Sequence, residues 1–558
     1  MDIAFWPAKK QAAAIKNKKI SALELLDHYL ARVGKHDGAI NAIIVKDVEG
    51  ARKRAKEADK ALAKGDVWGP LHGVPMTIKE SFDVVGMPTT WGLPELKDNF
   101  PKQDALSVTR LKQAGVTLYG KSNVPLLLSD WQSFNEVYGT TNNPWDLTRT
   151  PGGSSGGSAA ALAAGFCGIE AGSDIGASIR NPAHYCGVFG HKPSYGICSP
   201  RGQSLGTIAP SDISVIGPLA RGGADLMVAL DVMAGPDDID GTGWKLTLPK
   251  PRLPGIKGMR IAIMANDPIA PVDEEYAGKL EALARPLKKE GARVDLAARP
   301  DIDMAELWKV YVLLLRAATS ARLSPAQVAR WTEEAAKRGE DATDYIALMA
   351  RGNTLPHRVW LQLNEVRMRM RQACAAFFKE WDVLICPVDA GTAFPHDQEG
   401  ERQDRVITVN GEPQPTTTQL FWAGISGVCY LPAAVAPIGP AQGGLPPGVQ
   451  IIADSRTNRL IFIGPSEARG KLAALAQSLD TPTTRSANTR VIRLRHNDAK
   501  SLAETLGDIS EGLKNPESGE SATSARPQNI LIRADESLNA LVLLADPELI
   551  GTLESIVR

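Results

Sequence analysis

The feature that most constrains the fold of this chain is an alternation, from Pro70 onward, of short apolar runs with helical or glycine-rich segments. The apolar runs have the length and composition of β-strands, and they lie at 74–78, 116–119, 260–264, 383–387 and 449–452. Strands separated in this way by helices pair into a sheet that the helices cover. The alternation therefore predicts an α/β fold with a mostly internal sheet.

Helical patterns occupy two other parts of the chain. Within the first 65 residues, Ser21 and Glu24 form a capping-box pattern, and apolar residues follow at helical spacing until Gly34. Residues 300–380 are rich in Leu, Ala and Arg, which indicates an inserted helical cap. Residues 390–420 are polar and contain proline, so we interpret them as a mobile loop.

The charge balance excludes several classes of partner. The chain has 558 residues with 63 Lys and Arg against 63 Asp and Glu, so it has no net field to attract a polyanion. Nucleic acid and anionic membranes are therefore not expected as partners. No apolar window is long enough to span a membrane, and the N-terminus has no apolar signal segment, so we expect a cytoplasmic protein.

Cysteine and histidine spacing gives no metal or cofactor site. The six cysteines include no CxxC pair, which is typical of reduced thiols scattered in a core. The eight histidines form no HxxxH or HExxH pair, so we expect no metal and no cofactor.

Three segments have the composition of a catalytic site. They are an apolar strand that ends in a lysine (73–79), a Gly/Ser run before an Ala-rich helix (151–158), and the segment 172–180. A strand-end lysine is usually a surface charge, and the Gly/Ser run lacks the GK[ST] of a phosphate loop. The run also fits GxSxG, so a nucleophile elbow at Ser154 with a downstream acid and histidine is an alternative interpretation.

Together, and in this order, the three segments resemble the amidase signature family over residues 1–454. The resemblance implies a mixed central sheet covered by helices and a Ser–Ser–Lys triad. In that triad Ser178 is the acyl nucleophile, Ser154 is a bridging serine on a cis peptide, and Lys79 is the base. It also implies that the oxyanion hole is the turn before the nucleophile, which comprises Ile175, Gly176, Ala177 and Ser178.

The residues suit these roles chemically. A serine hydroxyl is a weak nucleophile until a neighbour takes its proton, and Lys79 can do so only when neutral. Its pKa of about 10.4 must then fall by about three units, and burial at the end of an apolar strand acts in that direction. We expect Ser155 to support Ser154, and Asp174 and Arg180 to order the loop. The family usually has Gly-Gly where this chain has Gly-Ala177, and a β-carbon there narrows the acyl pocket or demands a negative φ.

The sequence predicts a serine hydrolase that cleaves C–N bonds in small linear amides, including aryl amides or carbamates, with an esterase side activity. Leu128, Asp130 and Trp131 lie between the lysine and serine motifs, where family members line the acyl site. Two alternatives are an inactive amidase body that serves as an interaction protein, and the amidase subunit of an amidotransferase.

The end of the chain contains an internal repeat, in which Ala453-Asp454 and the residues after them are echoed from Ala534-Asp535. This tail resembles the periplasmic N-domains of type II secretion secretins, which implies a small α+β (KH-like βαββα) structure. We expect a partial module at 455–486 and a second module at 487–558, joined to the amidase part by fusion. Such a tail could mediate protein contacts.

Overall fold

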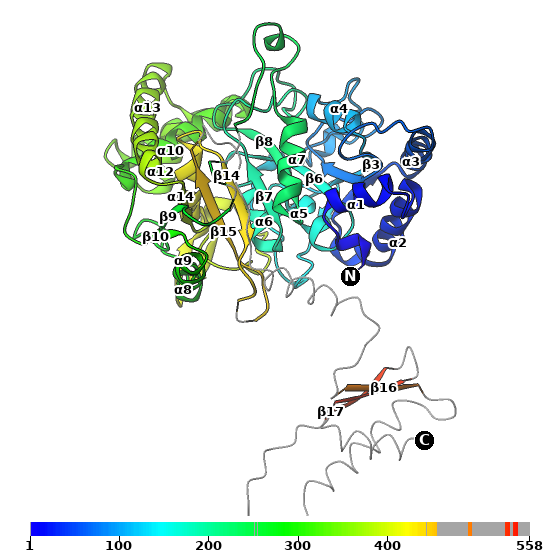
Figure 1. The fold of residues 1–558 in the computed structure, drawn as a ribbon. Coiled ribbons are helices and arrows are strands. Elements are labelled where there is room, and N and C mark those ends of the chain that lie inside the picture. The colour runs from blue at the N-terminus through cyan, green and yellow to red at the C-terminus, as the bar shows by residue number, and fades with distance from the viewer. Residues whose placement is uncertain are drawn as a thin grey trace, which may run out of the picture. The chain divides into compact units, whose positions relative to one another are not determined.

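The computed structural model describes residues 2–249, 252–253, 255–441, 443–454, 489–493, 531–535 and 540–544. The chain divides into two compact units, Met1–Leu472 and Ala473–Arg558 (Figure 1). Each unit is described by itself below.

The centre of the first unit is a sheet of eleven strands among the described residues, with parallel and antiparallel pairs mixed. The α/β fold and the mixed sheet expected from the sequence are therefore confirmed. The strand order is β1-β3-β2-β6-β8-β7-β14-β15-β11-β9-β10. The strands are β1 (Ile43–Lys46), β2 (Pro75–Lys79), β3 (Thr117–Ser122), β6 (Ile169–Asp174), β7 (Phe189–Lys192), β8 (Val215–Ala220), β9 (Arg260–Ile263), β10 (Arg293–Asp295), β11 (Val383–Cys386), β14 (Ala433–Pro437) and β15 (Gly448–Ala453). A separate short pair is formed by β4 (Phe134–Asn135) and β5 (Gly139–Thr140).

Helices cover this sheet along its length, with α1, α2 and α3 at one end and α10, α12 and α13 at the other (Figure 1). Leu162 of α5 and Leu219 of β8 belong to one apolar cluster, whereas Leu226 of α7 and Ile216 of β8 belong to another, because successive strand residues point to opposite faces. The helices are α1 (Ala8–Lys16), α2 (Ala22–Ile40), α3 (Val48–Ala63), α4 (Leu106–Gln113), α5 (Gly156–Ala163), α6 (Arg180–Cys186), α7 (Gly223–Met233), α8 (Glu274–Ala282), α9 (Ala284–Lys289), α10 (Met304–Thr319), α11 (Pro325–Arg338), α12 (Tyr345–Asn353), α13 (His357–Glu380) and α14 (Leu420–Gly427).

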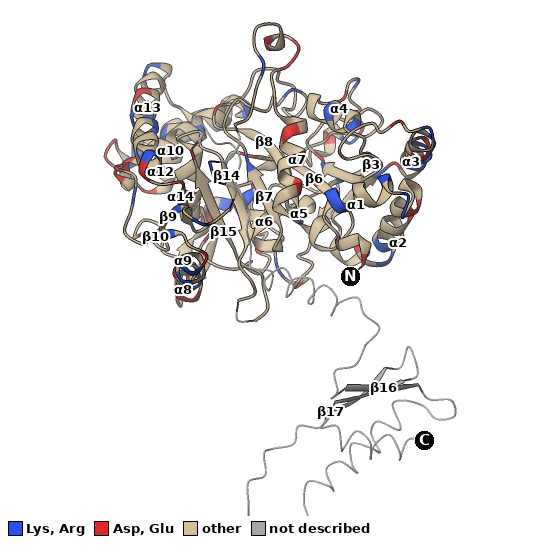
Figure 2. Ribbon diagram, viewed as in Figure 1, with Lys and Arg blue, Asp and Glu red and all other residues tan. Residues whose placement is uncertain are grey.

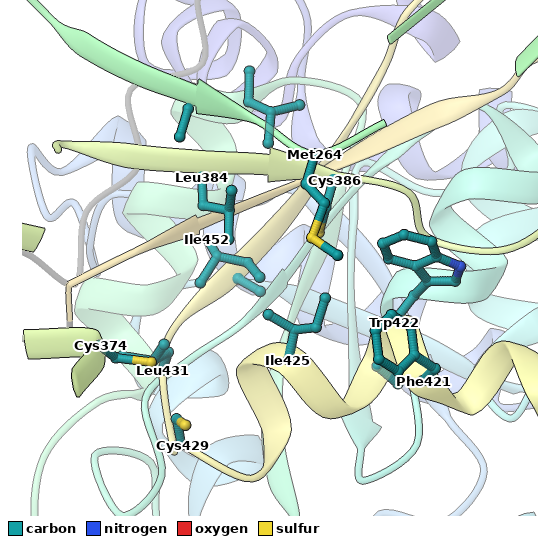
Figure 3. Packing of buried hydrophobic residues seen from close by; sticks show 14 of the residues in the cluster. Met264, Cys374, Leu384, Cys386, Phe421, Trp422, Ile425, Cys429, Leu431 and Ile452 are labelled. Carbon is teal, nitrogen blue, oxygen red and sulfur yellow. The ribbon is translucent and has the colours of Figure 1, made fainter. Parts of the chain in front are cut away.

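The helical segment predicted at 300–380 is present as α10 to α13. Its core continues into the sheet, where Leu384 of β11 and Ile452 of β15 pack with Ile425 and Trp422 of α14 (Figure 3). Trp422 is fully buried. Burial of a large apolar side chain is worth roughly 1.5–3 kcal/mol, so this cluster holds the helical segment on the sheet.

The N-terminal helices differ from the prediction in extent. Ser21 does form the capping box with Glu24, but α2 continues past Gly34 and ends at Asn41, which has a left-handed conformation. A β-carbon on Gly34 would meet only open space, so the glycine does not interrupt the helix. The strand β1, which follows directly, was not predicted.

The segment predicted as a mobile loop contains a β-hairpin of β12 (Val406–Val409) and β13 (Glu412–Pro415). Asn410 and Gly411 join the two strands, and both have positive φ values, 53° and 86°. An Asn-Gly pair between strand-like runs favours the tight turn of a hairpin, so the mobile-loop interpretation was wrong. Short 3₁₀ helices flank the hairpin, namely η6 (Arg402–Asp404) and η7 (Thr416–Gln419).

In the second unit the described residues are three strands, β16 (Thr489–Arg493), β17 (Leu531–Asp535) and β18 (Ala540–Leu544). They pair antiparallel in the order β16-β18-β17. The strand predicted near residue 489 and the two strands predicted around Asn539 are therefore present. The other predicted tail elements lie outside the described residues, namely the strands around Asn458 and the helices at 466–479, 499–509 and 547–557.

Charged side chains of both signs are spread over the outer helices of the first unit, as Figure 2 shows. All six cysteines are free and buried, as the sequence predicted. Among the described residues, no helix combines the length and the apolar composition that a membrane span requires.

Candidate active site

Lys79 is the last residue of β2, between β3 and β6 in the sheet. Met76 and Ile78 belong to an apolar cluster on one face, so the two-residue period of the strand places Thr77 and Lys79 on the other. β2 runs parallel to β6, and the carboxyl ends of the two strands therefore meet at one edge of the sheet. That edge is where open α/β sheets bind their ligands.

The Lys79 ammonium group is fully buried among hydroxyl groups. Its Nζ donates hydrogen bonds to the Oγ of Ser154 (2.7 Å) and the Oγ of Ser173 (3.0 Å). Burial lowers the pKa of Lys79 from 10.5 to about 7, although nearby carboxylates, Asp174 foremost, act in the opposite direction. A large share of this lysine is consequently uncharged at neutral pH, which is the state a general base needs.

Glu170 is a second buried ionisable group beside Lys79. Its Oε1 accepts a hydrogen bond from the Thr77 hydroxyl at 2.5 Å, and Ser122 and Ser158 also contribute hydroxyl groups to it. Burial raises the pKa of Glu170 from 4.5 to about 7. This carboxyl therefore titrates in the same range as Lys79, and its charge raises the pKa of the lysine.

Ser154 reaches Lys79 because the loop before α5 packs unusually close to its surroundings. The peptide bond between Gly153 and Ser154 is cis, as the family resemblance implied. Gly152 has a φ of 88°, and a β-carbon on Gly153 would lie 2.3 Å from the carbonyl oxygen of Asp130. No other residue type fits at Gly153, so the glycines of the motif place the serine.

Asp174 organises the turn between β6 and α6. Its carboxylate accepts hydrogen bonds from the backbone N–H of Ala177 (3.1 Å) and Ile179 (3.0 Å) and from Arg180 Nη2 (2.7 Å). Both partners of the Asp174–Arg180 pair are fully buried. Burial acts to raise the pKa of Asp174, but Arg180 outweighs it and holds the pKa below its usual value. The predicted loop-ordering contacts of these two residues are thus present.

The same contact changes the expected oxyanion hole. The Ala177 N–H already donates to Asp174, whereas the N–H groups of Ile175, Gly176 and Ser178 have no acceptor among the described residues. Ala177 itself has a φ of +70°, so the expectation that its β-carbon demands a negative φ was wrong. The left-handed conformation costs an L-residue roughly 1–2 kcal/mol, which the Asp174 contacts offset.

Two aromatic side chains hold the carbonyl side of this turn. Trp131 Nε1 donates to the carbonyl oxygen of Gly176 (2.8 Å), and the Tyr311 hydroxyl of α10 donates to that of Ile175 (3.0 Å). With their carbonyls fixed, the N–H groups of the turn are aimed to the opposite side. Trp131, which the sequence placed at the acyl site, is 4% exposed.

Ser178 lies beside the Ser154 loop, because Ser155 N–H donates to the carbonyl oxygen of Ser178 (3.0 Å). The Ser155 hydroxyl donates to the carbonyl oxygen of Ser173 at 3.4 Å. The Ser178 hydroxyl makes no hydrogen bond within the described residues, and the residue is 6% exposed against 1% for Ser154. The structure thus joins Lys79 to Ser154 directly, and it brings Ser178 to them through the backbone.

The other two predicted substrate contacts have different surroundings. Asp130 forms an ion pair with Arg405 Nη1 at 2.5 Å. Leu128, at the end of the 3₁₀ helix η3 (Leu126–Leu128), is half-buried and has a φ of 58°. The ion pair occupies a carboxylate that the sequence had offered to substrate.

Sequence reasoning missed Ser173 and Tyr311. Ser173 lies inside the third motif, next to Asp174, and that position is the signal that could have found it. Tyr311 lies in the helical cap, where nothing in the local sequence distinguishes it from other core aromatics.

A hollow of about 570 Å³ opens elsewhere in this unit, and its lining includes Tyr185 and Asp389 but none of the triad candidates. Asp389 accepts a hydrogen bond from Asn181 (3.0 Å), which in turn accepts one from Gly153 N–H (3.2 Å). The hollow therefore lies behind the serine loop, and the chemistry is not in it. The described residues contain no cluster of His, Cys, Asp and Glu side chains suited to a metal ion.

The family model for amidases matches residues 24–462. The chain belongs to the amidase signature family. It is thus an amidase-family hydrolase, a class that acts on C–N bonds. The resemblance of the tail is confirmed too, because residues 489–558 match the model for a bacterial type II/III secretion system short domain.

Relatives of known name match most of this amidase signature chain. Indoleacetamide hydrolase of Bradyrhizobium diazoefficiens is 33% identical over 485 residues, which cover 85% of this chain and 88% of that protein. A subunit of the glutamyl-tRNA(Gln) amidotransferase of a Synechococcus species is 31% identical over 478 residues, with 81% and 92% covered. The crystal structure of a bacterial aryl acylamidase of the amidase signature family has a TM-score of 0.69 at 24% identity, covering 86% of this chain and 99% of that one, which shows the shared fold.

Proposed function

We propose that the chain is a serine amidohydrolase that cleaves linear amides or carbamates through an acyl-enzyme. Ser178 is the nucleophile, Ser154 the bridging serine and Lys79 the base. The observation that carries the proposal is the 2.7 Å hydrogen bond from a fully buried lysine to Ser154 Oγ. Since a lysine with a pKa of about 7 can accept a proton at neutral pH, this pair supplies what a serine nucleophile needs.

In the first half of the reaction, Ser178 Oγ attacks the substrate carbonyl carbon and loses its proton to Ser154, which passes its own to neutral Lys79. The negative charge on the carbonyl oxygen is stabilised by the N–H groups of Ile175, Gly176 and Ser178. Each such donor is typically worth about 2.7–4 kcal/mol. The free Ser178 hydroxyl fits an unliganded site, because catalytic hydrogen bonds often tighten only when substrate binds.

The second half returns the proton. The C–N bond breaks as the leaving nitrogen takes a proton from Lys79 through Ser154, and the acyl group stays on Ser178. Water then enters, gives its proton along the same route and releases the acid. An ester follows the same path with an easier leaving group, so we infer an esterase side activity.

The substrate we propose is an aryl amide or aryl carbamate. This choice is supported by the names of two similar proteins, indoleacetamide hydrolase and aryl acylamidase, and by the aromatic rings near the turn, Trp91 and Trp131. Trp91 is fixed with a φ of 53°, which indicates a position held by its surroundings.

An assay with an acyl anilide, a small aryl carbamate and a primary amide tests the proposal. We expect wild-type turnover of at least the anilide and its loss in Ser178→Ala. Ser107→Ala is the matched control, because Ser107 is also buried but its hydroxyl has no partner and lies in α4. Equal rates for wild type and Ser178→Ala on all three substrates would show that the amidase body is inactive.

Glutamine is the fourth substrate to include. An amidotransferase-type subunit would release ammonia from glutamine in preference to the anilide, and this outcome would replace the acylamidase proposal. For the tail we propose a protein-docking role, with modules at 455–486 and 487–558, and for the whole chain a cytoplasmic location. Support for the docking role comes from the secretion-system domain match.

A further inference from the structure

Arg316, in the last turn of α10, carries a guanidinium group without an acceptor in the described part of the chain. Its Nε is buried and has no hydrogen-bond partner, and no ion pair within those residues involves this side chain. The recorded contact of its guanidinium is with the ring of Tyr345, at 5.3 Å from the ring centroid. The stem is packed tightly, since a β-carbon on Gly352 would lie 2.7 Å from Arg316 Cβ. The positive group is thus held in place but not neutralised.

Arg402, in η6, is a second guanidinium in the same region. Its Nη1 donates to the carbonyl oxygen of Ser129 (3.0 Å), and the group lies over the ring of Trp131 at 5.5 Å from the centroid. The nearest carboxylate, Asp130, is already paired with Arg405. Within residues 2–454, apart from the gaps stated above, Arg402 therefore has no carboxylate of its own.

The two groups lie next to each other and to the oxyanion turn. Burial and then the charge of Arg402 lower the pKa of Arg316 to about 9. Both charges also act on the hydroxyl of Tyr311, which donates to the carbonyl oxygen of Ile175. Trp131, beneath Arg402, donates to the next carbonyl of that turn. Two like charges therefore meet at the entrance to the proposed oxyanion hole.

Arginines with a purely structural role look different in this protein. The Arg180 guanidinium donates to Asp174, Ser426 and Gln450, and Arg367 donates to both carboxylate oxygens of Asp212. Buried charge without such partners is costly, so it is kept where a ligand supplies the counter-charge. A planar guanidinium fork fits a carboxylate in particular.

We propose that Arg316 and Arg402 form a subsite that binds a carboxylate group carried by the amide or carbamate substrate. This inference rests on the proposed function and narrows its substrate class to anionic amides. A carboxylate on the acyl chain or on the amine would reach the pair from the scissile bond according to its spacer, so both placements are tested.

Two matched pairs of anilides measure the preference for charge. On the acyl side, glutaryl 4-nitroanilide is compared with 5-oxohexanoyl 4-nitroanilide, in which a methyl group replaces one carboxylate oxygen. On the amine side, the acetanilide of 4-aminobenzoate is compared with that of 4-aminoacetophenone. We expect kcat/KM to favour the carboxylate in one pair by about 10- to 100-fold, mainly through KM, because a hydrogen bond between charged groups is of that strength.

Substitution then assigns the preference to residues. Arg316→Gln and Arg402→Gln are each expected to reduce the charged-to-neutral ratio by at least about tenfold, and Arg316→Lys to retain part of it. Arg338→Gln, on the exposed face of α11, is the matched control and should keep both the ratio and the activity. Circular dichroism confirms that each variant is folded.

The outcomes separate this inference from the proposed function. Turnover of both members of each pair at equal kcat/KM, or a ratio that survives both glutamine variants, overturns the subsite while the hydrolase proposal stands. If no anilide is turned over, calorimetry with the Ser178→Ala chain decides, since it measures binding of glutaryl 4-nitroanilide against its neutral partner. Tighter binding of the anion that is lost in the added Arg316→Gln substitution supports the subsite even then, and equal binding refutes it.

Discussion

Trp131 Nε1 and the carbonyl oxygen of Gly176 lie 2.8 Å apart, and this hydrogen bond joins the substrate-side loop to the turn that precedes Ser178. Tyr311 makes the equivalent contact to Ile175 from the helical cap. Two layers of the protein therefore fix the direction in which the turn presents its N–H groups. The precision of the proposed oxyanion hole depends on side chains that touch neither serine.

Removing either donor should slow the chemical step. We expect Trp131→Phe and Tyr311→Phe each to lower kcat about five- to tenfold on a neutral anilide with little change in KM, since one hydrogen bond of about 1 kcal/mol is lost and the ring is kept. Steady-state kinetics checks this. A rise in KM at constant kcat would show instead that these rings bind substrate directly.

The pH dependence should follow Lys79. Its neutral form is the base and its pKa is about 7, so kcat/KM should rise as pH increases through about 7 and then level off. Lys79→Met should abolish turnover. A profile that is flat from pH 5 to 9 would contradict a lysine base.

Glu170 offers a sharper test of the same assignment. Its negative charge raises the pKa of Lys79, so Glu170→Gln should shift the rising limb of the pH profile to lower pH. Glutamine keeps the size of the side chain and can still accept the Thr77 hydrogen bond. A shift to higher pH, or none, would show that the lysine does not control the limb.

Asp174 should matter for stability as well as for the turn. In Asp174→Asn the fully buried Arg180 loses its counter-charge, and breaking a buried pair in this way costs about 3–5 kcal/mol. Urea unfolding of the purified chain measures this loss. Glu334→Gln, which breaks an exposed pair with Arg338 on α11, serves as the control and should leave the unfolding midpoint unchanged.

The amidase part should function without the tail. All residues of the candidate site lie before Asp454, so we expect a chain that ends there to hydrolyse the anilide with the kcat of the full-length protein. Anilide kinetics of the two chains makes the comparison. A truncated chain that is folded but inactive would show that the tail completes the catalytic unit.

Local sequence predicted much of the fold. The Ser21 capping box, the apolar strands and the helical segment at 300–380 are encoded by neighbouring residues, whose periodicity survives in the folded chain. The errors were local signals read with the wrong weight. Gly34 was taken as a helix end although it faces open space, and Asn410-Gly411 was not recognised as a hairpin turn.

The candidate site divides in the same way. The sequence by itself determined Lys79, Ser154 and Ser178 as the chemical groups, because each lies in a short motif whose glycines and strand end leave a recognisable pattern. Tertiary structure decided their properties. The pKa of Lys79 depends on burial by the sheet, and the free N–H groups depend on Asp174, on Trp131, 45 residues from Gly176, and on Tyr311, 136 residues from Ile175. Contacts over such separations form only when the chain folds, so local sequence carries no trace of them.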